Sequence, residues 1–206
     1  MKVAFYAPLK SPNSAVPSGD RRVARALIQA LELKGHKVEI ASEFQTREAK
    51  GLPEAQEHLR VEGRKIADNL IVSYRALSGD KRPDVWFTYH LYYKAMDWIG
   101  PSVAEALSIP YVAAEVSYAP KRAGGPWDMS HQVLGDIIKN ADAIFGLNSL
   151  DSACVTSVMV DQSRLVPIKP FMELPAQLDR GKARSNIISL YQLDPAQPIL
   201  VTVAMM

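Results

Sequence analysis

Apolar and polar positions form two kinds of pattern that alternate along this chain. Short continuous apolar runs predict buried strands, and between them apolar residues recur every three or four positions, as on one face of a helix. The predicted strands occupy residues 2–7, 36–42, 82–90, 111–116, 143–147 and 164–168. The predicted helices occupy residues 20–34, 53–77, a stretch ending at 107, 128–140, 149–158 and 181–191. This alternation predicts an α/β, Rossmann-like fold, with a mainly parallel sheet and helices on both faces.

One further apolar run closes the sequence. Residues 198–204 follow Pro195 and Pro198 and predict a buried strand, with no sequence after it to cover its faces. We therefore expect one domain over residues 1–194. Residues 195–206 are then a boundary and the first strand of a second domain that this sequence lacks, and an open strand edge would allow self-association.

Composition narrows the class of protein. The 206 residues, 48% of them apolar, suffice for one large core. The 24 basic and 22 acidic residues are spread along the whole chain, which disfavours a nucleic-acid-binding protein. Cys154 is the single cysteine, which excludes an internal disulfide framework and fits a reducing, cytoplasmic location.

The sequence gives little indication of a membrane-spanning segment or of a metal site. No apolar run approaches the roughly 18 residues that a membrane span requires, so we expect no transmembrane segment, although peripheral membrane contact stays open. No Asp-x-Asp pair ends a predicted strand, and no His or Cys spacing suits zinc. We therefore expect no bound metal.

The candidate site follows from the predicted sheet. In a parallel sheet covered by helices, ligands bind at the carboxyl ends of the strands. The loops to consider therefore follow the predicted strands, and they occupy residues 8–20, 89–93, 115–127 and 147–151.

Several short motifs share the order and spacing of one family. They are Pro17-Ser-Gly-Asp, Gly35-His, Pro83-Asp-Val, Ser108-Ile-Pro, and Ala141-Asp followed by Ser149. Together they resemble the amino-terminal domain of retaining glycosyltransferases with the GT-B fold, family 4 (glycosyl transferase group 1). The resemblance covers almost the whole chain, and residues 165–173 and 198–204 resemble the passage into that family's donor-sugar domain.

The resemblance implies a function for the full-length protein. It would be a metal-independent transferase that moves a sugar from a nucleotide diphosphate sugar to an acceptor with retained anomeric configuration. The acceptor would be a sugar, a lipid or a small molecule, and the nucleotide sugar is a co-substrate, so no further cofactor is expected. This chain would supply the acceptor side and be inactive without the carboxyl-terminal donor domain.

The resemblance also places the loop before the first helix near the donor diphosphate. Gly19, Asp20 and Arg21 form this candidate phosphate loop, because the N–H groups and dipole at a helix amino terminus favour an anion. Asp20 stands where the family usually has a second glycine. Its charge would repel a diphosphate unless Arg21 or Arg22 offsets it.

Two residues are candidates for catalysis because they lie at the ligand edge of predicted strands. His90 could donate hydrogen bonds to a sugar hydroxyl or to the departing phosphate. Glu115 could accept a hydrogen bond from the acceptor or act as a weak base, although the resembling family often has a histidine there. The predicted acceptor-binding residues beside them are Tyr89, Tyr92, Ser117, Lys121 and Arg122. The tyrosines would form an apolar platform for a sugar ring, and the two cations would bind an anionic acceptor.

Other classes of protein fit the sequence less well. A receiver domain needs an acidic cluster after the first strand, and a dinucleotide-dependent dehydrogenase needs Gly-x-Gly-x-x-Gly there; residues 6–19 contain neither. A non-catalytic Rossmann-like binding domain, or a degenerate homologue of the glycosyltransferase, stays open as the alternative.

Overall fold

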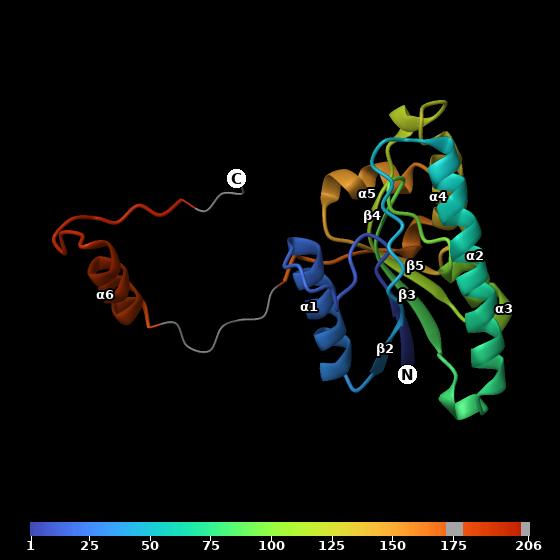
Figure 1. Cartoon of the computed structure of the whole chain (residues 1–206), viewed down its shortest axis with the longest axis horizontal. Coiled ribbons are helices and arrows are strands. Elements are labelled where there is room, and N and C mark those ends of the chain that lie inside the picture. Colours follow the sequence, from blue (N-terminus) through green and yellow to red (C-terminus); the bar gives the residue numbers. More distant parts are fainter. Residues whose placement is uncertain (172–178, 203–206) are drawn as a thin grey trace. The chain divides into compact units, whose positions relative to one another are not determined.

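A computed structural model describes residues 1–171 and 179–202 of the protein (Figure 1). Internal contacts divide the chain into two compact units, Met1–Met172 and Glu173–Met206. The first unit holds the sheet and its covering helices, so it is described first.

Six parallel strands form one sheet in the order β2-β1-β3-β4-β5-β6. Their bounds are β1 Lys2–Tyr6, β2 Lys37–Ser42, β3 Val85–Tyr92, β4 Tyr111–Ser117, β5 Ala143–Gly146 and β6 Leu165–Pro167. The strand order reverses direction beside β1 and β3, which is where ligands bind in open sheets of this kind. The predicted α/β, Rossmann-like fold is therefore confirmed.

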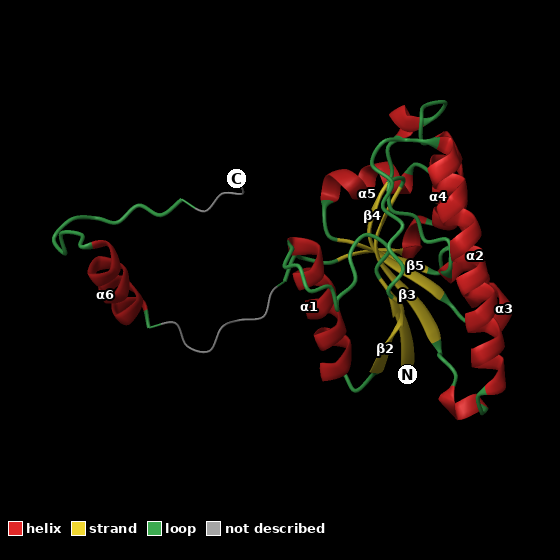
Figure 2. Ribbon diagram, viewed as in Figure 1, coloured by secondary structure: helices red, strands yellow, loops and turns green. Residues whose placement is uncertain are grey.

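Helices cover both faces of the sheet (Figure 2). The helices of this unit are α1 Gly19–Leu33, α2 Pro53–Ala76, α3 Gly100–Leu107, α4 Asp128–Asn140 and α5 Ser149–Thr156. The α1 helix buries Ala24 and Leu27 on one face, against Phe5 and Phe87. The other face of the sheet packs against α2, α3 and α4. There Trp86, Leu134 and other fully buried side chains form the larger core cluster.

The start of α1 is fixed by its own sequence. The hydroxyl of Ser18 accepts the N–H of Arg21 at 3.1 Å, which satisfies one of the unpaired donors of the first turn. At the other end, Gly35 has a φ of +80°, a conformation that glycine adopts without the steric cost of a Cβ. These caps place the amino terminus of α1 at the carboxyl edge of the sheet.

A buried carboxylate, Asp97, joins three elements of this unit. One of its oxygens accepts the N–H groups of Ile99 and Gly100 at 2.9 and 2.6 Å, at the start of α3. The other accepts the indole N–H of Trp86 at 3.1 Å, and the hydroxyls of Thr88 and Tyr111. Burial raises the pKa of Asp97, and the hydrogen bonds from Gly100, Thr88, Ile99 and Tyr111 oppose that effect.

Gly100 lies against this cluster with no room for a side chain. A Cβ there would collide with the indole nitrogen of Trp86 and with the carboxylate of Asp97. The glycine therefore lets the first turn of α3 approach the carboxylate closely.

In the described residues of the second unit there is one helix, α6 (Arg180–Tyr191), which confirms the helix predicted at 181–191. The carboxylate of Asp179 caps it by accepting the N–H of Lys182 at 3.0 Å. Residues 198–202 form no strand, unlike the prediction, and Leu200 is 95% exposed. A strand needs a neighbour for its backbone hydrogen bonds, and the described part of the chain provides none there. Residues 203–204 of that prediction, and residues 172–173 of the expected passage, lie outside the described residues.

We expect the Asp97→Asn substitution to lower the free energy of unfolding by about 2–4 kcal/mol. The new amide would turn an N–H toward the donors of Trp86, Thr88 and Tyr111 in a buried space. Urea unfolding of both proteins measures the difference. Asp136→Asn, an exposed carboxylate on α4, serves as the control. An Asp97→Asn protein as stable as the control variant would contradict this account of the buried carboxylate.

Candidate functional site

Two residues in left-handed conformation lie side by side at the carboxyl edge of the sheet. His90 in β3 has a φ of +60°, and Glu115 in β4 has a φ of +56°. On either side of them, Tyr89 pairs with Ala114 and Leu91 pairs with Val116. The two irregular residues therefore stand at the same level of adjacent strands.

This paired irregularity changes the direction of the side chains. Successive side chains of a regular strand point to opposite faces, so residues two positions apart share a face. Tyr89 and Leu91 do not: Tyr89 packs in the core cluster beneath α1, and Leu91 packs in the cluster on the other face of the sheet. His90 is the extra residue between them, and it turns toward α1. Ala114 and Val116 flank Glu115 in the same way.

Asp20, in the first turn of α1, is the partner of His90. Its carboxylate lies 2.8 Å from Nδ1 of the imidazole, and the two side chains are 34% and 21% exposed. A carboxylate can only accept, so Nδ1 carries the proton and Nε2 of the neutral ring keeps its lone pair. Among the described residues Asp20 forms no ion pair with Arg21 or Arg22, and its side-chain partner is the imidazole of His90.

The remainder of the predicted phosphate loop lies on the adjoining side of α1. A pocket of about 180 Å³ is lined by Pro17, Ser18, Arg21, Arg22 and Arg25. Within it, Nε of Arg21 is buried and has no hydrogen-bond partner among the described residues. Gly19 has open space where a Cβ would stand. The arginines, together with the open backbone at Gly19, are therefore the groups that could meet an anion.

Tyr89 and Tyr92 occupy different environments. Tyr89 is 1% exposed, so it cannot offer the exposed platform that the sequence predicts. Burial raises the pKa of its phenol, as do the charge of Glu115 and a hydrogen bond between the two side chains. Tyr92 is half-buried, and its ring lies 5.1 Å from that of His90. Tyr89 thus positions Glu115, while Tyr92 remains available to a ligand.

Ser117 has a partner within the protein. Its hydroxyl donates to the carboxylate of Asp151 at 2.9 Å, and that carboxylate also accepts from the side-chain amide of Asn148 at 3.2 Å. The Ser117 hydroxyl therefore links the end of β4 to the start of α5.

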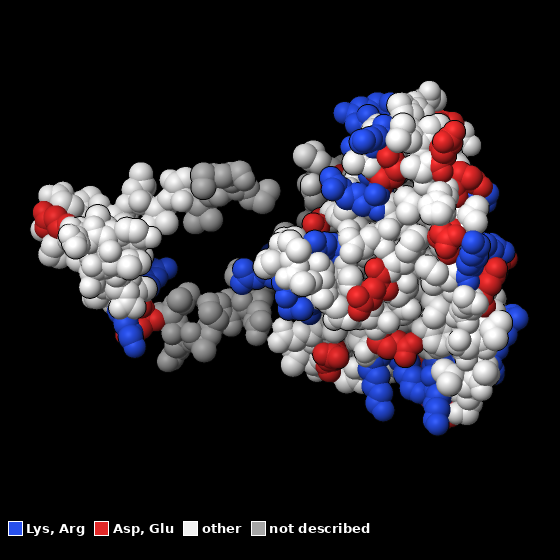
Figure 3. Space-filling view, in the orientation of Figure 1, with Lys and Arg blue, Asp and Glu red and all other residues white. Residues whose placement is uncertain are grey.

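Arg122 lies in an aromatic and cationic cluster, which comprises Tyr93, Lys94, Arg122 and Trp127. The rings of Tyr93 and Trp127 are 5.4 Å apart and nearly perpendicular. Nζ of Lys94 lies 4.6 Å from the Trp127 ring, and the guanidinium of Arg122 lies 5.0 Å from the Tyr93 ring. Lys121 is exposed beside it in the turn Pro120–Arg122. Basic side chains gather at this end of the first unit (Figure 3).

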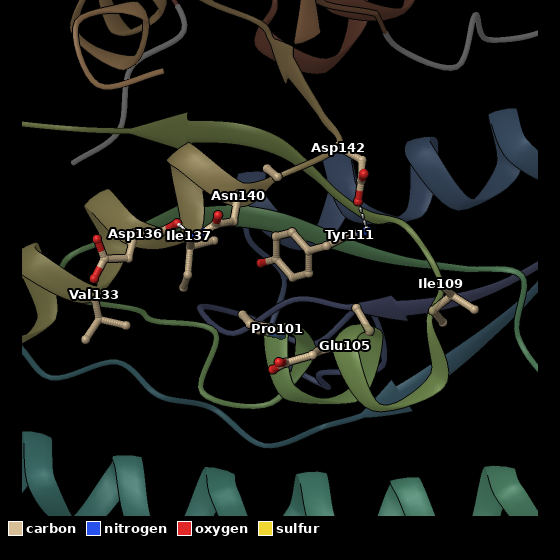
Figure 4. Close-up of a pocket in the computed structure, with 11 residues that line it drawn as sticks. Pro101, Glu105, Ile109, Tyr111, Val133, Asp136, Ile137, Asn140 and Asp142 are labelled. Carbon is tan, nitrogen blue, oxygen red and sulfur yellow. Dashed lines mark hydrogen bonds between the residues drawn. The ribbon is translucent and has the colours of Figure 1, made fainter. Parts of the chain in front are cut away.

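A larger cavity lies elsewhere, at the amino-terminal edge of the sheet. It measures about 580 Å³ and lies between α3 and α4, with Tyr111, Asp136 and Asp142 in its lining (Figure 4). Asp142 accepts the backbone N–H of Tyr111 at 2.8 Å, and the phenol of Tyr111 reaches Asp97. These polar groups serve the fold, so the candidate site is the carboxyl edge despite its smaller hollows.

Two further findings concern metals and membranes. Across residues 1–171 and 179–202, no three His, Cys, Asp or Glu side chains are arranged to hold a metal ion. Among the described helices, none is long and apolar enough to cross a membrane.

Comparison with solved structures identifies the class of fold. A structure of Arabidopsis thaliana UGT89C1 complexed with UDP matches 92% of the chain, with a TM-score of 0.54 at 13% identity. A structure of Anabaena HepE in complex with UDP-glucose gives a TM-score of 0.49 at 11% identity, over 93% of this chain and 50% of its own. A scan against protein-family models and a search of curated proteins found no match.

At 13% identity the likeness to the UGT89C1 structure establishes the fold alone. The chain has the α/β, Rossmann-like architecture seen in GT-B glycosyltransferases. It spans 55% of the UGT89C1 chain and so about half the length of the proteins that it matches.

We predict that glycine is better tolerated than alanine at positions 90 and 115. A left-handed backbone costs an L-residue with a Cβ about 1 kcal/mol, and glycine avoids this cost. His90→Gly and Glu115→Gly should each be more stable than the matching alanine variant in urea unfolding. At Ser117, a regular residue of β4, the order should reverse. Alanine variants as stable as the glycine variants at 90 and 115 would argue against the paired irregularity.

Glu48 provides a pH-dependent prediction. Burial raises its pKa, but N–H groups of Lys50, Gly51 and Leu52 and the indole of Trp127 hold it below the ordinary value. Ionised Glu48 therefore stabilises the fold above the unfolded pKa of about 4.3, and this contribution is lost as the pH falls through the lower folded pKa. Unfolding measured from pH 7 to pH 3 should show a smaller acid-induced loss of stability for Glu48→Gln than for the wild type. Equal losses would exclude this role.

Proposed function

We propose that this chain is the acceptor-side domain of a nucleotide-sugar-dependent glycosyltransferase. The observation that carries the proposal is the 2.8 Å contact between Nδ1 of His90 and the carboxylate of Asp20 at the carboxyl edge of the sheet. The contact leaves Nε2 of a half-buried imidazole available as a base. The likeness in fold to a UDP-bound structure supports the same class of reaction.

In the proposed reaction, Nε2 of His90 takes the proton of an acceptor hydroxyl while its oxygen attacks the anomeric carbon of the donor sugar. The bond between that carbon and the nucleotide diphosphate breaks, and the diphosphate leaves with the bonding electrons. Asp20 stabilises the imidazolium that forms, as the carboxylate of a catalytic triad does. Arg21 and the amino terminus of α1 would stabilise the negative charge of the diphosphate, without a metal or a further cofactor.

The pairing of His90 with Asp20 affects which anomeric configuration the product is expected to have. Retention, which the sequence resemblance implies, needs two successive displacements or attack from the face of the leaving group. A base that activates the acceptor for one direct displacement gives inversion, as it does in inverting glycosidases. The His90–Asp20 pair favours this second route, so we propose inversion and keep retention as the competing prediction.

The proposal assigns the acceptor to this chain and most of the donor to a second domain. The chain spans 55% of the UGT89C1 chain, and we propose that a carboxyl-terminal domain binds most of the donor. The boundary from residue 195, a cytoplasmic location, and inactivity of this chain by itself belong to the same proposal. Calorimetry of this chain with UDP- and GDP-sugars should show little binding, and micromolar affinity would contradict the division.

We predict that His90→Ala lowers the turnover of the full-length protein by about 10²- to 10⁴-fold, the usual contribution of a general base. Asp20→Asn should lower it less, because the imidazole remains but its positive form loses a stabilising charge. Transfer from UDP- and GDP-sugars to a panel of acceptors measures both effects. His36→Ala, in the turn before β2 at the opposite edge of the sheet, is the control.

Two results would count against the proposal. Unchanged turnover in His90→Ala would exclude His90 as the base. No transfer by the full-length protein, from any of these donors, would favour the alternative of a non-catalytic domain or degenerate homologue.

A further inference from the structure

The aromatic and cationic cluster concentrates positive charge at one end of the first unit. Lys94 and Arg122 both lie over the rings of Tyr93 and Trp127, at 4.6 to 5.9 Å from the ring centres. Neither forms an ion pair with a described carboxylate. Two cations that share one pair of rings repel each other, and an anion between them would relieve the repulsion.

Two carboxylates beside this cluster, Glu48 and Asp128, already accept hydrogen bonds from other groups. Glu48 accepts the N–H of Lys50 at 2.8 Å and that of Gly51, and it accepts the indole N–H of Trp127 at 3.1 Å. Asp128 accepts the N–H of Gly124 and the side-chain amide of Gln132, each at 2.6 Å. Nε of Arg122 is buried and has no hydrogen-bond partner among the described residues. The guanidinium thus retains unused hydrogen-bonding capacity.

The surroundings hold the cluster in place. Trp127 is 9% exposed and is tied to Glu48. The carbonyl of its neighbour Pro126 accepts from the side chain of Gln56 at 2.8 Å, and Ser130 donates to the same side chain at 2.7 Å. The Trp127 ring is therefore fixed before any ligand arrives, which lowers the entropic cost of binding.

Aromatic rings connect this cluster to the candidate catalytic histidine. The ring of His90 lies 5.1 Å from that of Tyr92, which lies 5.7 Å from that of Tyr93. A ligand along this row of rings would place one end at Nε2 of His90 and the other at the two cations.

We propose that Lys94 and Arg122 bind a phosphate group carried by the acceptor. The inference rests on the proposed function, and it narrows the acceptor to a phosphate-bearing molecule whose hydroxyl reaches His90. A guanidinium offers paired N–H donors that match phosphate oxygens, and the ammonium of Lys94 adds a point charge. The rings of Tyr93 and Trp127 hold both cations in position.

The test measures binding of phenyl phosphate to this chain by calorimetry, with phenol as the uncharged probe. We expect binding of phenyl phosphate that weakens as salt rises, and none of phenol. Arg122→Gln and Lys94→Gln should each weaken binding about tenfold. Arg122→Lys should lose less, because it keeps the charge and loses the paired donors.

A double variant on the opposite side provides the matched control. Lys37→Gln with Lys139→Gln removes two exposed cations, and it should bind phenyl phosphate as the wild type does. Circular dichroism of each variant checks the fold, and the charge-conserving Arg122→Lys keeps the test informative if a glutamine variant unfolds. Phenyl phosphate that fails to bind, or that binds the two single glutamine variants as tightly as the control, overturns the proposal.

Vesicles distinguish the source of the phosphate. Co-sedimentation with phosphatidylcholine vesicles, with and without phosphatidylglycerol, tests a lipid headgroup, and phenyl phosphate tests a free phosphate ester. Vesicle binding that depends on Arg122 supports a lipid acceptor, and its absence alongside phenyl phosphate binding supports a water-soluble one. Phosphate binding without any sugar transfer would preserve this inference and refute the proposed function. Sugar transfer without phosphate binding would refute this inference and preserve the proposed function.

Discussion

The carboxylate of Asp97 is the constraint on which the first unit depends. It is fully buried, and it accepts hydrogen bonds from β3, from β4 and from the first turn of α3. Removing a charge from water is costly unless donors surround it, and here five donors converge on two oxygens. The arrangement fixes the spacing of β3 and β4, the two strands that carry His90 and Glu115 to the edge of the sheet.

That fixed pair of strands explains why a local irregularity can become a site. His90 and Glu115 interrupt neighbouring strands at the same level, while Leu91 and Val116 beyond them return to the core. The core contacts on both sides hold two left-handed residues that would otherwise relax. The left-handed conformation turns His90 toward α1, where its Nδ1 meets the carboxylate of Asp20.

The sequence predicts the fold well because strands of a parallel sheet are covered on both faces and therefore appear in the sequence as continuous apolar runs. Runs such as 143–147 and 164–168 match strands of the structure closely. The site is predicted in part: His90 and Asp20 are found at the right edge, but their pairing is a contact over 70 positions that no local pattern contains. No glycine marks the irregularity at His90. The signal that could have revealed it is an ionisable residue, His90 or Glu115, between two core residues in each strand.

The central claim is that His90, paired with Asp20, takes a proton from the acceptor in one direct displacement. The anomeric configuration of the product tests it most directly. Proton NMR of the product made by the full-length protein from an α-linked nucleotide sugar distinguishes the two anomers by their coupling constants. The account predicts a β-linked product, formed by inversion. An α-linked product, formed with retention, would contradict it.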